Sequence, residues 1–231
     1  MAAPTVANSA IGNALGVTAV TTAGVTTTTG NRFLVLVPPY PTTPTSVTDS
    51  KGNTYSLKVS YLWASFGATF TVYECVNGTG GAGHTATVNW SSSGNRSATF
   101  LEIASSAGTD CTVTAADASS PYTITSWGLA SSAELGILLG AADGVANPAT
   151  FAESTGFTIR QSQQDNTNYN AYFVASKDLT GTNGPITPSF TSTGSSTGAS
   201  ILMTFTPIVS PATTPGTLGQ WDQCLRIEGW F

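Results

Sequence analysis

Two glutamates and one histidine are the residues whose types could support catalysis. Glu74 and Glu102 fall inside predicted β-strands, where a partner across the sheet would give the paired carboxylates that a hydrolase uses. His84 is the sole histidine, and no Gly-x-Ser-x-Gly motif accompanies it. Outward-facing strand carboxylates that limit edge pairing explain both glutamates without any reaction. We therefore predict no enzymatic activity and assign no catalytic residue.

Clustered side-chain oxygens raise the alternative of a calcium site. Asp49, Ser50 and Asn53 lie in one predicted turn, and a second Asp/Asn cluster runs from Asp165 to Asn168, including Asn166. Asx turns explain both segments without a metal, and neither contains an Asp-x-Asp-x-Asp-Gly loop. We expect no metal and no cofactor.

Aromatic side chains point to a different chemistry, the binding of a carbohydrate. Trp and Tyr present an apolar ring beside a polar group, and a surface of this kind needs little charge. The candidates are Trp63, Trp127 and Tyr172, with Tyr169 close to Tyr172 in sequence. Residues three apart in a strand face opposite sides of the sheet, so these two tyrosines would share a platform only across a bulge. Core packing is the alternative for each large aromatic.

Composition excludes several classes of partner. Of 231 residues, 40% are hydrophobic but only 8% are charged, whereas 39 Thr and 26 Ser supply most of the polarity. Ordinary soluble proteins have about 25% charged residues. Seven Lys and Arg and a net charge of -5 leave no basic face for phosphates, so we expect no nucleic-acid partner.

The elements that must position these residues are strands. Short strand patterns alternate with turns rich in Gly, Pro, Asn and Asp, and no segment has a helical period. This pattern predicts an all-β fold, a single two-sheet β-sandwich of jelly-roll or immunoglobulin-like type over residues 1–207. In Thr69–Val76, alternation places Phe70 and Val72 on a buried face and leaves the other face to solvent. The clearest predicted strands are Arg32–Val37, Thr54–Tyr61, Thr69–Val76, Thr85–Trp90, Ala98–Ile103, Ala133–Leu139, Phe157–Gln161, Tyr169–Ala175 and Ser200–Phe205.

The composition changes after Pro207. Residues 208–219 form a Pro/Thr/Gly linker, which prolines keep extended, and residues 220–231 form an apolar peptide. We expect this peptide to anchor the protein to another chain, because so apolar an end is not left in water. The alternative is that it folds back as an extra strand. The anchoring side chains would be Trp221, Leu225, Ile227, Trp230 and Phe231.

The three cysteines leave their pairing open. Cys75 and Cys111 lie in predicted strand-rich segments and would pair if neighbouring strands brought them together, while two buried free thiols are the alternative. Cys224 lies in the tail.

The N-terminal segment lacks the basic residues and the apolar run of a secretory signal peptide. No run of 18 apolar residues is present, so we expect no membrane span. A hydroxyl-rich surface without an export signal suits a virion protein, made in a host cytoplasm and exposed after assembly and lysis. A signal that has already been removed is the alternative.

Several segments resemble a β-sandwich domain family found in bacteriophage structural proteins and bacterial surface proteins. The resemblance covers about residues 8–207 and implies a β-sandwich, with a hairpin at the first motif and with no catalytic residues to carry over. It rests on the segments VTDSKGNTY at 47–55, YECVN at 73–77, TATVNW at 85–90, ATFLEI at 98–103, ELGILL at 134–139, GFTIR at 156–160 and FTP at 205–207.

Together these patterns predict a non-enzymatic structural or interaction protein on a virion surface. A capsid decoration protein or a fibre-like appendage subunit is the most concrete version, with other virion proteins or copies of itself as partners. The alternative is a carbohydrate-binding adhesion module whose ligand is a host-surface glycan.

Overall fold

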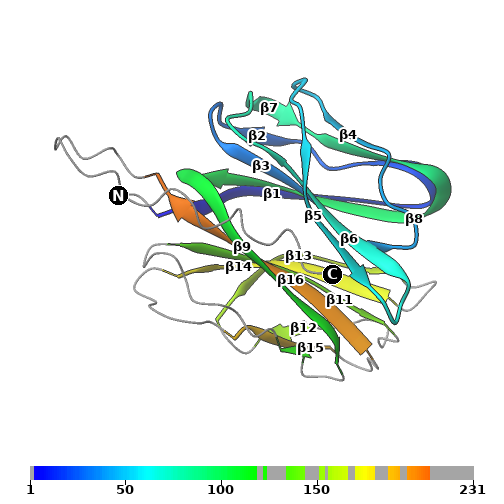
Figure 1. Cartoon of the computed structure of the whole chain (residues 1–231). Coiled ribbons are helices and arrows are strands. Elements are labelled where there is room, and N and C mark those ends of the chain that lie inside the picture. Colours follow the sequence, from blue (N-terminus) through cyan, green and yellow to red (C-terminus); the bar gives the residue numbers. More distant parts are fainter. Residues whose placement is uncertain are drawn as a thin grey trace, which may run out of the picture.

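The protein is an all-β molecule in the computed structural model, as the sequence predicted. The residues that the structure describes are 3–118, 122–123, 134–143, 151–153, 156–165, 170–179, 187–192 and 197–208. Within these ranges there is no helix, and hence none long and apolar enough to cross a membrane. The strands up to β8 lie together in one half of the molecule, and those from β9 onward fill the other half (Figure 1).

The first half is dominated by a six-stranded antiparallel sheet. Its strands follow the order β1-β8-β3-β6-β5, and β4 pairs with β8 beside this path. A two-stranded sheet, β2-β7, lies at its end. The bounds are β1 Thr5–Thr21, β2 Val25–Thr27, β3 Arg32–Tyr40, β4 Ser46–Asp49, β5 Ser56–Trp63, β6 Ala68–Cys75, β7 Gly81–His84 and β8 Ala86–Ala104.

The second half contains a five-stranded antiparallel sheet in the order β13-β14-β11-β16-β9. A smaller three-stranded sheet, β10-β15-β12, accompanies it. The bounds are β9 Ser106–Ala118, β10 Tyr122–Thr123, β11 Leu135–Asp143, β12 Phe151–Glu153, β13 Thr158–Asp165, β14 Asn170–Asp178, β15 Ser189–Ser192 and β16 Thr197–Pro207. Four sheets are therefore present in the described residues, where the sequence predicted two.

The two large sheets share one apolar core. Strand β3 contributes Leu34 and Leu36 to it, and strand β11 contributes Ile137 and Leu139 from the other sheet; all four are fully buried. The same core takes in Phe205 of β16. These strands read as continuous apolar runs because each has both faces covered, so neither face needs polar residues.

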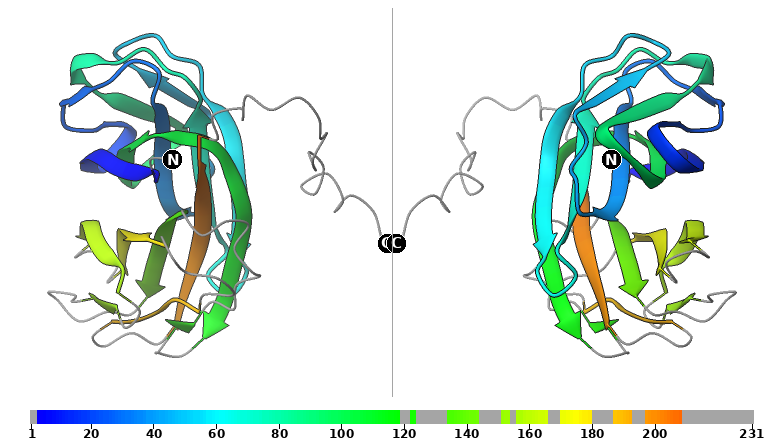
Figure 2. Two further views of the ribbon diagram at one scale, coloured as in Figure 1. Left: turned by 90° about the vertical axis from the view of Figure 1, so that its left-hand side faces the viewer. Right: turned by 90° about the vertical axis from the view of Figure 1, so that its right-hand side faces the viewer.

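The first sheet curls strongly, which gives it a second core of its own (Figure 2). In β3 the residues that alternate with Leu34 and Leu36 are Phe33, Val35 and Val37, and they pack into this second core. It also contains Val88, Trp90, Ala98 and Phe100 of β8.

A glycine allows the curl of β1. The N–H of Ala23 donates to the carbonyl of Ile11 over 3.1 Å, so the strand folds back toward itself. A Cβ on Gly12 would lie 2.4 Å from the carbonyl oxygen of Thr21, a distance that side chains do not reach. Only glycine fits at this close approach of the backbone.

Three expectations for the first half were wrong. Thr85–Trp90 and Ala98–Ile103 are one strand, β8, because the Ser/Gly-rich segment between them keeps pairing with β1. The second face of β6 is not left to solvent, because the curl covers it, and Cys75 packs in the second core. The motif at 47–55 is not a hairpin turn, because β4 pairs with β8 while β5 pairs with β6.

Cys75 is a buried free thiol, so the predicted alternative of a Cys75–Cys111 disulfide is not formed. Burial raises the pKa of the thiol, and the charges of Asp49 and Glu74 raise it further. This thiol is therefore an apolar packing group rather than a reactive one. The linker at 208–219 beyond Ile208 and the apolar peptide at 220–231, with Cys224, lie outside the described residues.

Candidate functional site

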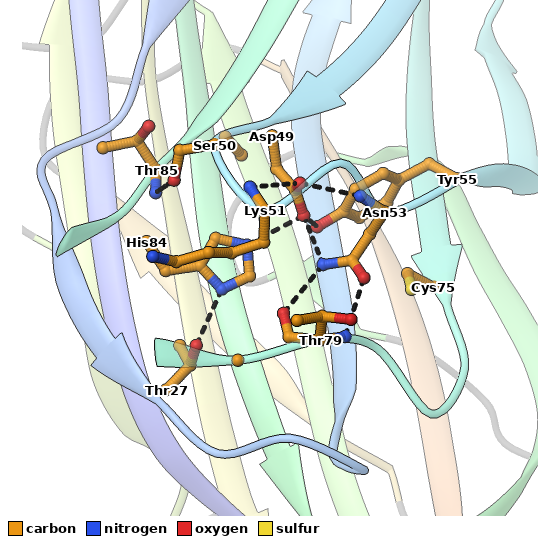
Figure 3. A network of polar contacts seen from close by, with 12 residues as sticks. Thr27, Asp49, Ser50, Lys51, Asn53, Tyr55, Cys75, Thr79, His84 and Thr85 are labelled. Atoms are coloured by element: carbon orange, nitrogen blue, oxygen red, sulfur yellow. Dashed lines mark hydrogen bonds and ion pairs between the residues drawn. The ribbon is translucent and has the colours of Figure 1, made fainter. Parts of the chain in front are cut away.

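A buried polar network joins three strand ends in the first half (Figure 3). Thr27 ends β2, Asp49 ends β4 and His84 ends β7. His84 Nε2 lies 2.8 Å from Asp49 Oδ2, and His84 Nδ1 lies 2.7 Å from Thr27 Oγ1. The side chains of Asp49 and His84 are both fully buried. The histidine ring also packs against the rings of Phe33 and Phe100, each with its centroid at 4.8 Å.

Asp49 is saturated with hydrogen-bond donors. Its Oδ1 accepts the backbone N–H groups of Lys51 and Asn53, at 2.9 and 3.0 Å. Its Oδ2 accepts the side-chain amide of Asn53, the hydroxyl of Tyr55 and the ring of His84. Burial raises the pKa of Asp49, but the hydrogen bonds of Asn53, His84 and Lys51 outweigh it, so the pKa lies below its usual 3.8.

This network holds the loop in place and leaves no oxygen of Asp49 for a cation. The two backbone N–H bonds to Oδ1 are those of an Asx turn, so that explanation of the 49–53 segment is confirmed. Burial and the charge of Asp49 raise the pKa of Tyr55, which keeps its phenol a donor. Among the described residues, no group of three or more His, Cys, Asp or Glu side chains is placed to hold a metal ion.

The two glutamates singled out in the sequence do not point outward, contrary to the expectation. Glu102 is fully buried and accepts hydrogen bonds from the backbone N–H of Thr28 and the amides of Asn8 and Asn31. Glu74 is 7% exposed and pairs with Arg32. The curl of the first sheet covers both carboxylates, and each is tied to different partners rather than to the other.

A separate pocket of about 630 Å³ lies between the two large sheets at one end of the molecule. This size falls within the range of about 300–1,000 Å³ that is usual for small-molecule sites. Its wall comes from both sheets, chiefly from the end of β3, the middle of β8, and parts of β11, β13 and β14. The lining includes Asn13, Pro38, Pro39, Tyr40, Thr42, Trp63, Phe66, Ser92, Gly94, Asn95, Arg96, Asp143, Gln163 and Tyr172.

Buried polar groups without partners distinguish this pocket from the Asp49 network. Tyr172 is 6% exposed, and its hydroxyl makes no hydrogen bond to the part of the chain that the structure describes. Arg96 is likewise 6% exposed, and its Nε has no partner among the same residues. Burial raises the pKa of Tyr172, so its hydroxyl keeps its proton and stays a potential donor. Polar groups buried without a partner are destabilising, and in a pocket they are placed to meet a ligand.

The structure brings two of the three predicted sugar-binding residues together. Trp63 and Tyr172 come from different sheets and both line the pocket. Trp63 is buried, and the half-buried Phe66 stacks on it with ring centroids 4.8 Å apart. Phe66 is therefore the more accessible ring of this pair. Trp127 and Tyr169 lie outside the described residues.

Sequence reasoning missed Arg96 and Asp143 as pocket residues. Arg96 lies in the Ser/Gly-rich segment that was interpreted as a break between strands. The sequence did contain a signal, because the whole chain has only seven Lys and Arg residues. An arginine inside a Ser/Gly-rich segment is therefore unusual in this protein. Trp221, Leu225, Ile227, Trp230 and Phe231 lie outside the described residues.

The comparisons with known proteins add no relative. The chain matches no family model, no curated protein and no solved structure.

Proposed function

We propose that this chain is a non-enzymatic interaction protein and that its pocket binds a saccharide. The observation that carries the proposal is the pocket itself, where aromatic rings and buried polar groups without partners converge from two sheets. Aromatic rings pack against the C–H faces of a sugar, and the polar groups match its hydroxyls. The carboxylates that would support a hydrolase are tied into other contacts, which supports a binding role.

We further propose the setting and the finer fold. The hydroxyl-rich, charge-poor composition supports a virion surface as the setting. The resemblance of the segment at 47–55 and of the other motifs to bacteriophage structural proteins supports the same setting. The core shared by the two large sheets supports a β-sandwich of jelly-roll or immunoglobulin-like type.

A binding assay on the full chain tests the saccharide proposal. The probe is a panel of defined neutral and acidic oligosaccharides, followed by calorimetry on the ones that bind. We expect Phe66→Ala to weaken binding by up to about tenfold, the value of one aromatic contact. Phe151→Ala is the matched control, because Phe151 is another half-buried phenylalanine and does not line the pocket. If no saccharide of the panel binds, or both variants weaken binding equally, the pocket is not a sugar site.

A second candidate is assembly with copies of this chain on the virion. The observation that favours it is strand β5, which is at an edge of the first sheet and exposes Leu57 by 54% and Leu62 by 57%. An open strand edge with exposed apolar side chains is a template for pairing with another chain. The apolar peptide at 220–231 would add burial of roughly 1.5–3 kcal/mol for each large side chain.

Light scattering separates the contributions of the edge and of the tail. The samples are the full chain, a chain ending at Pro207, and the double variant Leu57→Lys/Leu62→Lys. If the full chain forms a defined oligomer and one of the two changes makes it monomeric, self-assembly is supported. The change that does so identifies the surface responsible. If the full chain is a monomer, self-assembly is excluded.

A further inference from the structure

We propose that the saccharide carries a carboxylate and that Arg96 is the residue that pairs with it. The inference rests on the proposed saccharide-binding function of the pocket and adds the charge class of the ligand. It is carried by a contrast between the two buried arginines of the first sheet.

Arg96 is a buried cation without a carboxylate partner. It is 6% exposed, and no Asp or Glu of the described residues forms an ion pair with it. Arg32, which is 5% exposed, pairs with Glu74. A buried charge is destabilising unless an opposite charge accompanies it. The pocket therefore places an unmatched positive charge on its wall.

The guanidinium of Arg96 is held in position by neutral groups. Its carbon lies 5.0 Å from the ring centroid of Tyr40 and 5.1 Å from that of Trp90. Its Nη2 donates to the hydroxyl of Thr42, at 2.9 Å, and to the carbonyl of Ser92, at 3.1 Å. Ser92 Oγ lies at 3.4 Å from the same nitrogen. Every hydrogen bond of Arg96 within the described part of the chain uses Nη2.

The remaining donors suit a carboxylate. A guanidinium has five N–H groups in a planar fork, and the bonds of Nη2 leave those of Nε and Nη1 without partners among the described residues. The N–H groups of Nε and Nη1 lie on different edges of the guanidinium, so a carboxylate would accept a charge-assisted hydrogen bond from one of these two nitrogens. Gly94 lets the backbone pass close to this guanidinium, because a Cβ there would lie 3.1 Å from the guanidinium carbon.

The other lining groups favour a sugar over a polyanion. Asp143 lies on the same pocket wall, and the chain has a net charge of -5, so a ligand with many negative charges would be repelled. A carboxylate, an amide and a phenol are suitable partners for hydroxyls, and Asp143, Gln163 and Tyr172 supply them. One negative charge among several hydroxyls is the composition of an acidic sugar.

Matched pairs of probes test the charge class. Calorimetry on the full chain compares glucuronic acid with glucose and digalacturonic acid with galactobiose, and tetraglutamate serves as an acidic peptide. We expect at least one acidic sugar to bind about tenfold or more tightly than its neutral counterpart, the value of one charge-assisted pair. We also expect Arg96→Gln to remove this preference, so that the variant binds the acidic sugar no more tightly than its neutral counterpart.

Arg160→Gln is the matched control, because Arg160 is an exposed arginine outside the pocket lining. It removes the same charge from the chain and should leave the preference intact. If Arg96→Gln does not fold, the unaltered protein is compared on digalacturonic acid and on its methyl ester, which keeps the sugar rings and removes the charge. Equal affinity for the two overturns the pairing with Arg96.

The outcomes separate this inference from the proposed function. Equal affinity for acidic and neutral sugars overturns the inference and leaves saccharide binding intact. Tighter binding of tetraglutamate than of any sugar overturns the choice of a saccharide and shows that an acidic peptide is the ligand. No binding to any sugar of the panel overturns the proposed function itself.

Discussion

The two buried polar clusters of this protein differ in whether their groups satisfy one another. Both carboxylate oxygens of Asp49 and both ring nitrogens of His84 have partners within the chain. In the pocket, the hydroxyl of Tyr172 and the Nε of Arg96 have none among the described residues. Both clusters are about equally inaccessible, so burial alone does not distinguish them. Complete pairing marks a structural network, whereas incomplete pairing beside a cavity marks a binding site.

The largest effect should come from breaking the closed network at its centre. We expect Asp49→Ala to lower the free energy of unfolding by roughly 3–5 kcal/mol, because the donors of Asn53, Tyr55 and His84 lose their acceptor. Urea unfolding followed by tryptophan fluorescence measures the loss. A loss below about 1 kcal/mol would show that the loop relaxes and that the network is not structural.

A smaller loss should follow when only the outer partner of the histidine is removed. Thr27→Val keeps the shape of the side chain but deletes the bonds to His84 Nδ1 and to the N–H of Gly81. We expect a decrease of about 1–3 kcal/mol in the same urea assay, since buried groups are left without partners. Thr48→Val is a suitable control, because Thr48 is an exposed threonine on β4. Equal losses in both variants would contradict the prediction.

Acid should weaken the closed network through Asp49. Its pKa in the folded protein lies below the usual 3.8, so the unfolded chain binds a proton first as the pH falls. The stability that this carboxylate contributes is therefore complete above about pH 4 and is lost as the pH falls through the lower, folded pKa. Urea unfolding at pH 6 and pH 3 measures the difference, and Asp49→Asn should reduce it. If Asp49→Asn loses as much stability in acid as the unaltered protein, the loss comes from other groups.

The smallest change in stability should come from the pocket. Tyr172→Phe removes a buried hydroxyl that has no partner in the described part of the chain, so we expect stability to stay within about 0.5 kcal/mol or to rise by up to about 1 kcal/mol. Saccharide binding should weaken in the same variant, because the hydroxyl is then missing for the ligand. A clear loss of stability would show that this hydroxyl has a structural partner, and the contrast between the two clusters would fail.

Local patterns were enough to predict the strands with two covered faces. The runs at Arg32–Val37 and Ala133–Leu139 became β3 and most of β11, because continuous apolar runs bounded by turn residues leave few other structures. Four short strands were missed. The short strands β2, β4, β7 and β12 contain few apolar residues, so their pairing depends on the neighbours that the curl of the first sheet supplies.

The sequence by itself determined the all-β class, the charge-poor and hydroxyl-rich composition, and the identity of Trp63 and Tyr172 as aromatic candidates. These follow from composition and from the two-residue period of strands, which are local properties. Only the tertiary structure decided that Glu74 and Glu102 are buried, that Asp49 meets His84, and that Arg96 faces a pocket with no carboxylate partner among the described residues. Each of these depends on how far the first sheet curls and on which strands of the second sheet it meets. Contacts between residues far apart in the chain have no local signal, so no pattern within a single strand could predict them.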